Sequence, residues 1–207
     1  MMILLITFGF DEKFALRAIF RRGLRAGDRV IAIVPERNDP RAEKAFSALK
    51  HVVGGAIPDA SIEKMAVPSE NFLKAVSHLR KLITELLHSG DKLVVNVSGG
   101  QRILILELLT ALLNLGAYDV ELEIETEDSS AMATFPLRVM MKIDLDQTDL
   151  KFLKILAQGP KGLNEVCLHS NMSKSSAWRR LKKLATLKLI EKRGRKYHIT
   201  KLGYSKI

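Results

Sequence analysis

The sequence LVVNVSGGQRILILELLTALLNLG, residues 93–116, decides the fold of the chain. Residues 93–97 are mostly apolar and rich in valine, which predicts a strand buried on both faces of a parallel sheet. A polar turn with two glycines, residues 98–102, leads directly into residues 103–115, a predicted apolar helix that Gly116 ends. A strand followed at once by a helix is the repeating unit of an α/β fold.

The same alternation occupies the sequence before this stretch. Residues 3–7 and 30–34 are predicted strands, and helices are predicted over residues 11–25, ending near Gly27, and from Asp39-Pro40 onward. A short strand is predicted near residues 61–65, and a further helix from a Ser69 cap to Gly90. With two more strands, at 120–127 and 133–143, residues 1–143 are predicted to form a Rossmann-like domain with a mostly parallel sheet.

Two features of this domain concern its exposed faces. Apolar side chains surround almost the whole helix at 103–115, so it needs cover on two sides. We expect the sheet on one side and the same helix of a second subunit on the other, which predicts a homodimer; the alternative is cover by other helices of the same chain.

In residues 120–127 glutamates alternate with apolar residues, and we interpret them as a solvated or edge-guarding face and not as a cation site.

Composition excludes several classes of protein. The chain has a single cysteine, Cys167, so we expect no disulfide and a cytoplasmic location. It has no Cys/His cluster at metal-ligand spacing, so we expect no metal and no cofactor. The apolar stretches are too short for a bilayer span, which needs about 20 residues. The five histidines are scattered and no catalytic motif is present, so we expect no enzymatic activity.

Charge is distributed unequally along the chain. Residues 144–207 contain 15 Lys and Arg against five Asp and Glu, whereas residues 1–143 contain 18 of each. The whole formal net charge of +10 therefore lies in the C-terminal part, which predicts a domain boundary near residue 144 and a polyanionic partner.

The order of elements in residues 144–207 predicts a winged helix-turn-helix. Two helices and a turn precede a basic helix capped by Ser173, and two short strands follow around Arg193-Gly194-Arg195. We expect these residues to contact double-stranded DNA: Ser173, Lys174, Ser175, Ser176, Arg179, Arg180, Lys183, Arg193, Arg195 and Lys196. Trp178, on the same helix, is expected to anchor the small core, although an aromatic ring there can also stack on nucleic acid.

Two turns are candidates for a ligand site in the first domain, because ligands of open parallel sheets bind at the carboxyl ends of the strands. They are residues 7–11 and 98–102. Gly99 and Gly100 allow close approach to the backbone, the following helix start favours anions, and Arg102 adds a phosphate donor. Neither turn has the glycine pattern of a dinucleotide or nucleoside triphosphate loop.

Two of these segments and the order of the domains resemble the CRISPR-associated Rossmann-fold (CARF) regulators of archaeal type I-A systems. The resemblance covers essentially the whole chain and rests on ITFGFDEKFALR at residues 6–17, on VSGGQR at residues 97–102, and on a Rossmann-like domain before a winged helix. It implies a homodimer that binds a cyclic oligoadenylate, with cyclic tetra-adenylate expected, across its two-fold axis. The implied ligand-binding residues are Gly9, Phe10, Asp11, Ser98, Gly99, Gly100, Gln101 and Arg102.

The leading functional hypothesis is accordingly a DNA-binding transcription regulator of CRISPR-associated genes or arrays, controlled by that ligand. Two alternatives remain at this point. One is a ring nuclease that cleaves the cyclic oligoadenylate it binds, and the other is a constitutive DNA-binding protein whose first domain only dimerises.

Overall fold

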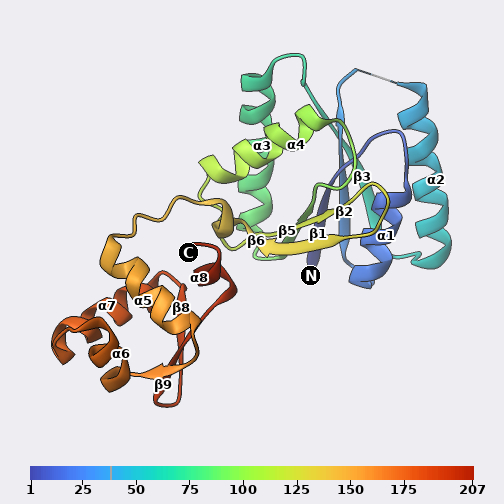
Figure 1. Cartoon of the computed structure of the whole chain (residues 1–207). Coiled ribbons are helices and arrows are strands. Elements are labelled where there is room, and N and C mark those ends of the chain that lie inside the picture. The colour runs from blue at the N-terminus through green and yellow to red at the C-terminus, as the bar shows by residue number, and fades with distance from the viewer. Residues whose placement is uncertain (38) are drawn as a thin grey trace. The chain divides into compact units, whose positions relative to one another are not determined.

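Residues 1–37 and 39–207 are described by a computed structural model, in which the chain divides into two units, Met1–Met140 and Met141–Ile207 (Figure 1). The sequence predicted the boundary near residue 144.

The first unit is a six-stranded sheet with helices on both faces, and it confirms the predicted Rossmann-like, mostly parallel architecture. The strand order is β3-β2-β1-β4-β5-β6, and only the β5–β6 pair is antiparallel. Its elements are β1 (Met2–Thr7), α1 (Lys13–Arg22), β2 (Arg29–Pro35), α2 (Pro40–Ala56), β3 (Ser61–Val67), α3 (Phe72–His88), β4 (Lys92–Asn96), α4 (Arg102–Asn114), β5 (Glu121–Glu125) and β6 (Met132–Pro136).

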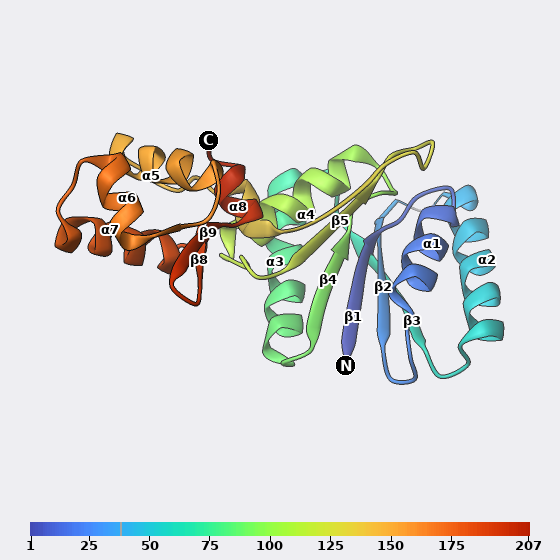
Figure 2. The same ribbon diagram turned by 60° about the horizontal axis from the view of Figure 1, so that its bottom comes forward.

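Two hydrophobic layers hold the helices to the sheet. Successive residues of a strand point to opposite faces, so Leu4 and Ile6 of β1 pack with α1 and α2, whereas Ile3 and Leu5 pack with α3 and α4. Figure 2 shows β1 between β2 and β4, at the centre of the sheet. Burial on both faces explains why the strands are apolar runs and not alternating ones.

Several helix and strand ends differ from the sequence-based prediction. α1 ends at Gly23, whose φ of +61° is left-handed, and not near Gly27. Asn71, not Ser69, caps α3 by accepting a hydrogen bond from the Lys74 amide. β6 ends at Pro136 and a 3-10 turn, Leu137–Met140, follows, so the predicted last strand is shorter than residues 133–143.

The glutamates of β5 are not the solvated face that the sequence predicted. β6 is the edge strand, and Glu123 and Glu125 are buried beneath three arginines of α1, Arg17, Arg21 and Arg22. The Arg21 Nε donates to Glu123 at 2.6 Å and the Arg22 Nε to its other oxygen at 2.8 Å. The glutamates that alternate with apolar residues in β5 thus form ion pairs that join the sheet to α1. A buried carboxylate needs such charged partners.

The apolar helix α4 is covered on two sides within its own chain. Leu104, Leu108 and Leu112 are fully buried between the sheet and α3, which packs against α4. Ile103 and Leu106, one turn apart, remain 39% and 58% exposed. Other elements of the same chain, the alternative weighed above, therefore cover most of α4. The surface of α4 that remains for a second subunit is near its N-terminal end.

The second unit combines helices with a three-stranded antiparallel sheet in the order β7-β9-β8. The predicted helices and hairpin are present, together with β7 and α8, which the sequence did not indicate. Its elements are α5 (Gln147–Ala157), β7 (Lys161–Gly162), α6 (Leu163–Ser170), α7 (Lys174–Thr186), β8 (Ile190–Arg193), β9 (Lys196–Ile199) and α8 (Lys201–Tyr204).

In the part of the chain that the structure describes, no helix is both long and apolar enough to cross a lipid bilayer.

Replacing Glu123 by glutamine tests the contact between β5 and α1. The neutral amide cannot serve two guanidinium groups, and its NH2 group faces donors, so we expect Glu123→Gln to lower the free energy of unfolding by about 1–3 kcal/mol. Glu127→Gln, at an exposed position just past the same strand, is the matched control and should change it by less than about 0.5 kcal/mol. Chemical denaturation of both variants measures the difference; equal stabilities would contradict a structural role for the buried carboxylate.

Candidate functional site

The two turns that the sequence singled out meet in space. β1 and β4 are neighbours at the centre of the sheet, where the order of connections reverses, so the turns that follow them lie side by side. The Thr7 hydroxyl donates a 2.6 Å hydrogen bond to the Gly99 carbonyl. A Cβ atom on Gly9 would lie 3.0 Å from the Cα of Gly100. The contact is therefore backbone against backbone, and both turns form one surface.

Glycine is required on both sides of this contact. Gly100 has a φ of +82°, and a Cβ there would lie 3.1 Å from the Phe8 nitrogen. A Cβ on Gly99 would lie 3.1 Å from the Thr7 carbonyl oxygen. Side chains at these positions would separate the turns, so the Ser-Gly-Gly sequence has a structural reason beyond ligand access.

Ser98 fixes the second turn to the neighbouring strand. Its hydroxyl oxygen accepts a 2.9 Å hydrogen bond from the Glu125 amide, and its own amide donates to the side-chain oxygen of Asn96 at 3.0 Å. Asn96 is buried, and its Nδ2 has no hydrogen-bond partner among the described residues. The Ser98 hydroxyl thus holds backbone in place, as expected for a loop hydroxyl without a paired base.

The start of α4 offers unsatisfied donors to an anion. Gln101 is the N-cap residue with an extended backbone, its side chain makes no capping hydrogen bond, and the first turn contains no acidic residue. Arg102 is exposed, and no ion pair of Arg102 is found among the described residues. Asp11 is not paired with Arg102; its carboxylate accepts a 2.9 Å hydrogen bond from the Lys13 amide. Free amides, the helix dipole and a free guanidinium together favour a phosphate here.

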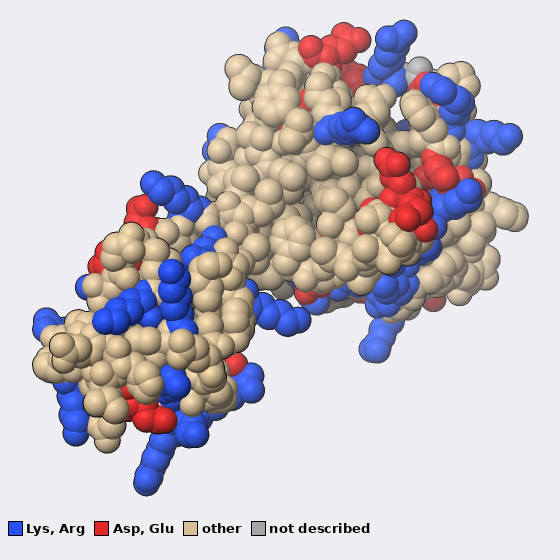
Figure 3. Space-filling model, in the orientation of Figure 1, with Lys and Arg blue, Asp and Glu red and all other residues tan. Residues whose placement is uncertain are grey.

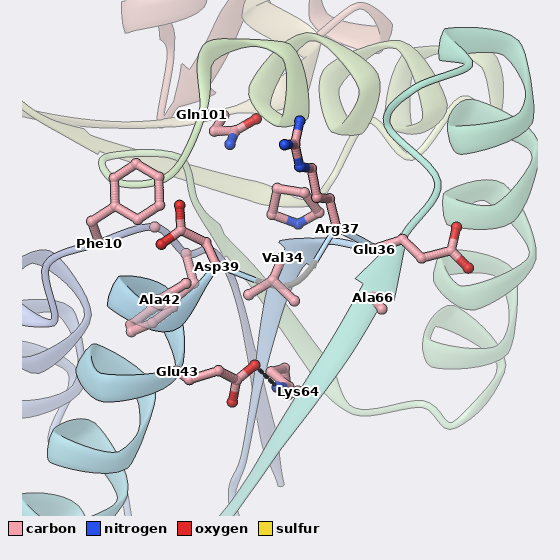
Figure 4. A pocket seen from close by; sticks show the side chains of 13 residues that line it. Phe10, Val34, Glu36, Arg37, Asp39, Ala42, Glu43, Lys64, Ala66 and Gln101 are labelled. Carbon is pink, nitrogen blue, oxygen red and sulfur yellow. Dashed lines mark hydrogen bonds and ion pairs between the residues drawn. The ribbon is translucent and has the colours of Figure 1, made fainter.

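Two hollows adjoin the turns. The smaller, about 180 Å³, lies between the β1–α1 turn, the ends of β2 and β3, and α2 (Figure 4). The larger, about 730 Å³, lies between the end of β2 and the starts of α3 and α4. Both are lined by Pro35, Glu36, Arg37 and Gln101, so they are adjacent compartments of one region.

The ring of Phe10 forms one wall of the smaller hollow. The Arg41 guanidinium lies 4.1 Å from the centre of this ring, and Asp39 holds that guanidinium with a 2.9 Å hydrogen bond. The side-chain hydrogen bond from Arg41 also lowers the pKa of Asp39, with a contribution from the Arg41 amide. A half-exposed aromatic ring thus stacks with a guanidinium beside the smaller hollow.

A buried carboxyl group lies next to the larger hollow. Glu107 of α4 is inaccessible to solvent and accepts a 2.8 Å hydrogen bond from Ser69, which lines the hollow. Burial raises the pKa of Glu107, and its second oxygen has no partner among the described residues. The environment therefore favours the neutral acid over the carboxylate.

The residues expected to contact DNA separate into two groups in the second unit. Ser173 caps α7 by accepting from the Ser176 amide. Arg180 and Lys183 bind Asp149, a fully buried carboxylate of α5, at 2.9 and 2.5 Å, and Arg180 also pairs with Asp146. The hydrogen bond from the Asp149 amide, followed by that from Arg180, lowers the pKa of Asp146. These two cations hold α7 against α5, a role that the sequence did not reveal.

The remaining basic residues are exposed on one helix face and on the hairpin. Lys174 and Arg179 of α7 and Arg195 and Lys196 of the hairpin are exposed, and Arg193 pairs with Glu191 of its own strand at 2.5 Å. Figure 3 shows Lys and Arg outnumbering Asp and Glu on the visible face of this unit.

Trp178 is not the core anchor that the sequence predicted. Its side chain is 48% exposed, and the Lys182 ammonium lies 5.2 Å from the centre of its ring. Ala177, Leu181 and Leu184 fill the buried side of α7 instead. The exposed face of the helix therefore carries an aromatic ring among its cations.

Within residues 1–37 and 39–207, no group of His, Cys, Asp and Glu side chains is arranged to hold a metal ion.

Comparison with protein families identifies the first unit. Residues 2–136 match the family described as the Csa3 CRISPR-associated Rossmann-like domain. The chain belongs to this family. The match covers the whole six-stranded sheet and both glycine turns of the Csa3-type domain. A comparison with curated proteins found no match.

Comparison with solved structures found matches at low sequence identity. Csm6 of Enterococcus italicus, solved with cyclic hexa-2′-fluoro-hexa-dAMP bound, has a TM-score of 0.50 at 10% identity, over 90% of this chain and 48% of its own. The protein VC1899 of Vibrio cholerae has a TM-score of 0.49 at 13% identity, over 99% of this chain and 63% of its own. The chain thus spans less than two thirds of either solved chain, and the likeness to Csm6 concerns the fold alone.

Sequence reasoning singled out both turns of the candidate site but not the residues that line the hollows beside them. Arg37 after β2, Asp39 at the N-cap of α2 and Ala66 near the end of β3 line the smaller hollow. The available signal was their position, because the carboxyl ends of parallel strands meet at one edge of the sheet.

The backbone contact between the turns predicts opposite effects for two glycine substitutions. Gly9→Ala forces a Cβ against the Gly100 backbone, and we expect it to lower the free energy of unfolding by about 1–3 kcal/mol. Gly54→Ala, inside α2 with open space around its Cβ, should raise it by about 0.5–1 kcal/mol. Urea denaturation of the two variants checks this; a Gly9→Ala protein as stable as the parent would mean that the turns are not in contact.

Proposed function

We propose that this chain is a homodimeric, DNA-binding transcription regulator of CRISPR-associated genes or arrays, of the archaeal type I-A kind, controlled by a cyclic oligoadenylate. Cyclic tetra-adenylate is the proposed effector. The observation that carries the proposal is the meeting of the two glycine turns beside the uncapped start of α4, because it places free amides and Arg102 on one exposed surface.

The exposed side of α4 supports a symmetric assembly around this surface. Ile103 and Leu106 lie one turn apart on α4, directly after Arg102, and both are exposed. Pairing of this apolar surface with its copy in a second chain brings two Arg102 residues to one axis. A cyclic oligonucleotide has the matching symmetry, with equivalent phosphates on opposite sides of the ring.

The order of elements in the second unit supports a winged helix. α5, α6 and α7 precede the β8–β9 hairpin, with Gly194 at its tip in the left-handed region. α7 is the proposed recognition helix and the hairpin the proposed wing. The net positive charge of this unit favours a phosphate backbone as the partner.

Arg102→Ala tests the sensor role of the first domain. We expect it to weaken binding of cyclic tetra-adenylate by two or more decades, since each lost charge-assisted contact costs about 1.5–3 kcal/mol and a dimer loses two. The melting temperature and DNA binding of the ligand-free protein should stay near the parent values, because Arg102 is exposed and has no ion pair among the described residues. Titration calorimetry measures the affinities for the ligand and for DNA, and thermal melting gives the melting temperature.

The outcomes separate the alternatives. Wild-type protein that gives no heat with cyclic tetra-adenylate, yet binds DNA, would indicate a constitutive DNA-binding protein. Linear products after incubation with labelled ligand would indicate a ring nuclease. A lowered melting temperature of Arg102→Ala would assign that side chain a structural role.

A pair of neighbouring arginines tests the DNA-binding face of α7. Arg179→Ala removes an exposed cation and should weaken binding to a duplex selected by the wild-type chain by about 1–3 kcal/mol without changing stability. Arg180→Ala should instead lower the free energy of unfolding, because it leaves the buried Asp149 carboxylate with Lys183 alone. Fluorescence anisotropy measures the DNA affinity, and urea denaturation measures the free energy of unfolding. If both variants lose affinity and stability to the same extent, Arg179 and Arg180 do not have these separate roles.

A further inference from the structure

The bulkiest side chain of α7 faces outward. Trp178 is 48% exposed and lies just outside the buried stripe that Ala177, Leu181 and Leu184 form. An aromatic side chain removes roughly 150–250 Å² of surface from water when a partner covers it. Trp178 therefore offers a partner a large apolar contact on the surface of a basic helix.

Lysines lie on both sides of this ring along the helix. Residues four apart are neighbours on one helix face, so Lys174, Trp178 and Lys182 form a single row. The Lys182 ammonium lies 5.2 Å from the centre of the indole ring. The row thus combines an apolar ring with cations that attract a phosphate backbone.

This row lies on the flank of α7 that α5 leaves open. Arg180, on the other flank, pairs with Asp146 and with the buried Asp149 of α5. Two residues along a helix correspond to a rotation of about 200°, so Trp178 and Arg180 point to nearly opposite sides. α5 therefore covers one flank of α7, and the indole ring on the other flank stays half exposed.

Duplex DNA offers one apolar group to a ring in this position. The bases of a duplex cover one another by stacking, so a helix in the major groove meets their edges and not their faces. Those edges carry hydrogen-bond donors and acceptors, and thymine adds its C5-methyl group. An indole ring that packs on this methyl group distinguishes a thymine from the other bases at that place.

We propose that Trp178 is a specificity-determining residue, which packs on a thymine methyl group in the major groove while Lys174 and Lys182 meet the flanking phosphates. The inference rests on the proposed function, and it adds base recognition by a side chain that was not among the expected DNA contacts. Arg179, the next residue, keeps the role proposed for it above.

Replacing thymine by deoxyuridine tests the contact one methyl group at a time. Uracil keeps the hydrogen-bonding edge of thymine and lacks the methyl group alone. In a duplex selected by the wild-type chain, we expect a thymine position at which this replacement weakens binding about fourfold, equivalent to the ~0.8 kcal/mol of one buried carbon group. Fluorescence anisotropy with the full chain measures the affinities.

The same replacement in two variants assigns the contact to a side chain. Trp178→Ala should bind the thymine and deoxyuridine duplexes equally at that position, because the ring that senses the methyl group is gone. Leu168→Ala is the matched control, since it removes an 81% exposed apolar side chain from the neighbouring helix α6, and it should keep the fourfold preference. Thermal melting confirms that both variants are folded.

Intrinsic fluorescence gives a second measurement without any substitution. Trp178 is the only tryptophan of the chain, so the tryptophan emission reports on this site alone. A saturating amount of the selected duplex should reduce quenching by acrylamide, a neutral quencher, because the DNA covers the ring.

The possible failures are distinguishable. Wild type that binds no duplex overturns the proposed function and the inference together. Wild type that binds a duplex overturns the inference alone if no methyl preference depends on Trp178, or if the duplex leaves acrylamide quenching unchanged. Tighter binding of single strands than of duplex, lost in Trp178→Ala, would assign the ring to base stacking instead. If Trp178→Ala is unfolded, Trp178→Gln, a good helix former without a ring, replaces it.

Discussion

The backbone contact between the β1–α1 and β4–α4 turns is the constraint on which the rest of the first unit depends. Gly9 and Gly100 leave no room for a Cβ between them, and the Thr7 hydroxyl fixes the Gly99 carbonyl. This contact exists because β1 and β4 pair at the centre of the sheet. It sets the place where α4 begins, and so the place of its free amides and of Arg102.

Hydrogen bonds and ion pairs extend from this contact across the sheet. Ser98 accepts from the Glu125 amide, and the Glu125 side chain pairs with Arg17 and Arg21 of α1. The helix after the first turn is thus attached to the strand that holds the second turn. The two turns, β5 and α1 are thus linked by one connected set of hydrogen bonds and ion pairs.

The basic residues of the second unit have two different tasks. Arg180 and Lys183 neutralise the buried Asp149, which also closes the capping box of α5, so they contribute to the fold. Lys174, Arg179 and Lys182 lie on the exposed face of α7, with Trp178 among them. Net charge alone therefore overstates the number of cations in this unit that have no carboxylate partner.

Sequence alone determined the features that depend on local pattern. The valine-rich run before Ser98, the glycines after it and the apolar helix that follows fixed the strand, turn and helix of an α/β unit, and the excess of Lys and Arg after residue 144 marked the second unit. Both turns of the candidate site followed from the rule that ligands bind where parallel strands end. The strand, turn and helix predictions are confirmed because hydrophobic period and backbone conformation are properties of neighbouring residues, whereas the ligand site stays a prediction.

Only the tertiary structure decided which charged and aromatic side chains are partnered. Glu123 has the sequence pattern of a solvated strand face, and the arginines that bury it come from α1, about one hundred residues away in the chain. Arg180 and Arg179 are adjacent in sequence, yet one faces Asp149 and the other faces solvent. The hollow beside Phe10 combines α2, β2 and β3 with both turns. Partners from distant segments are set by strand pairing and helix packing, and a one-dimensional pattern contains neither.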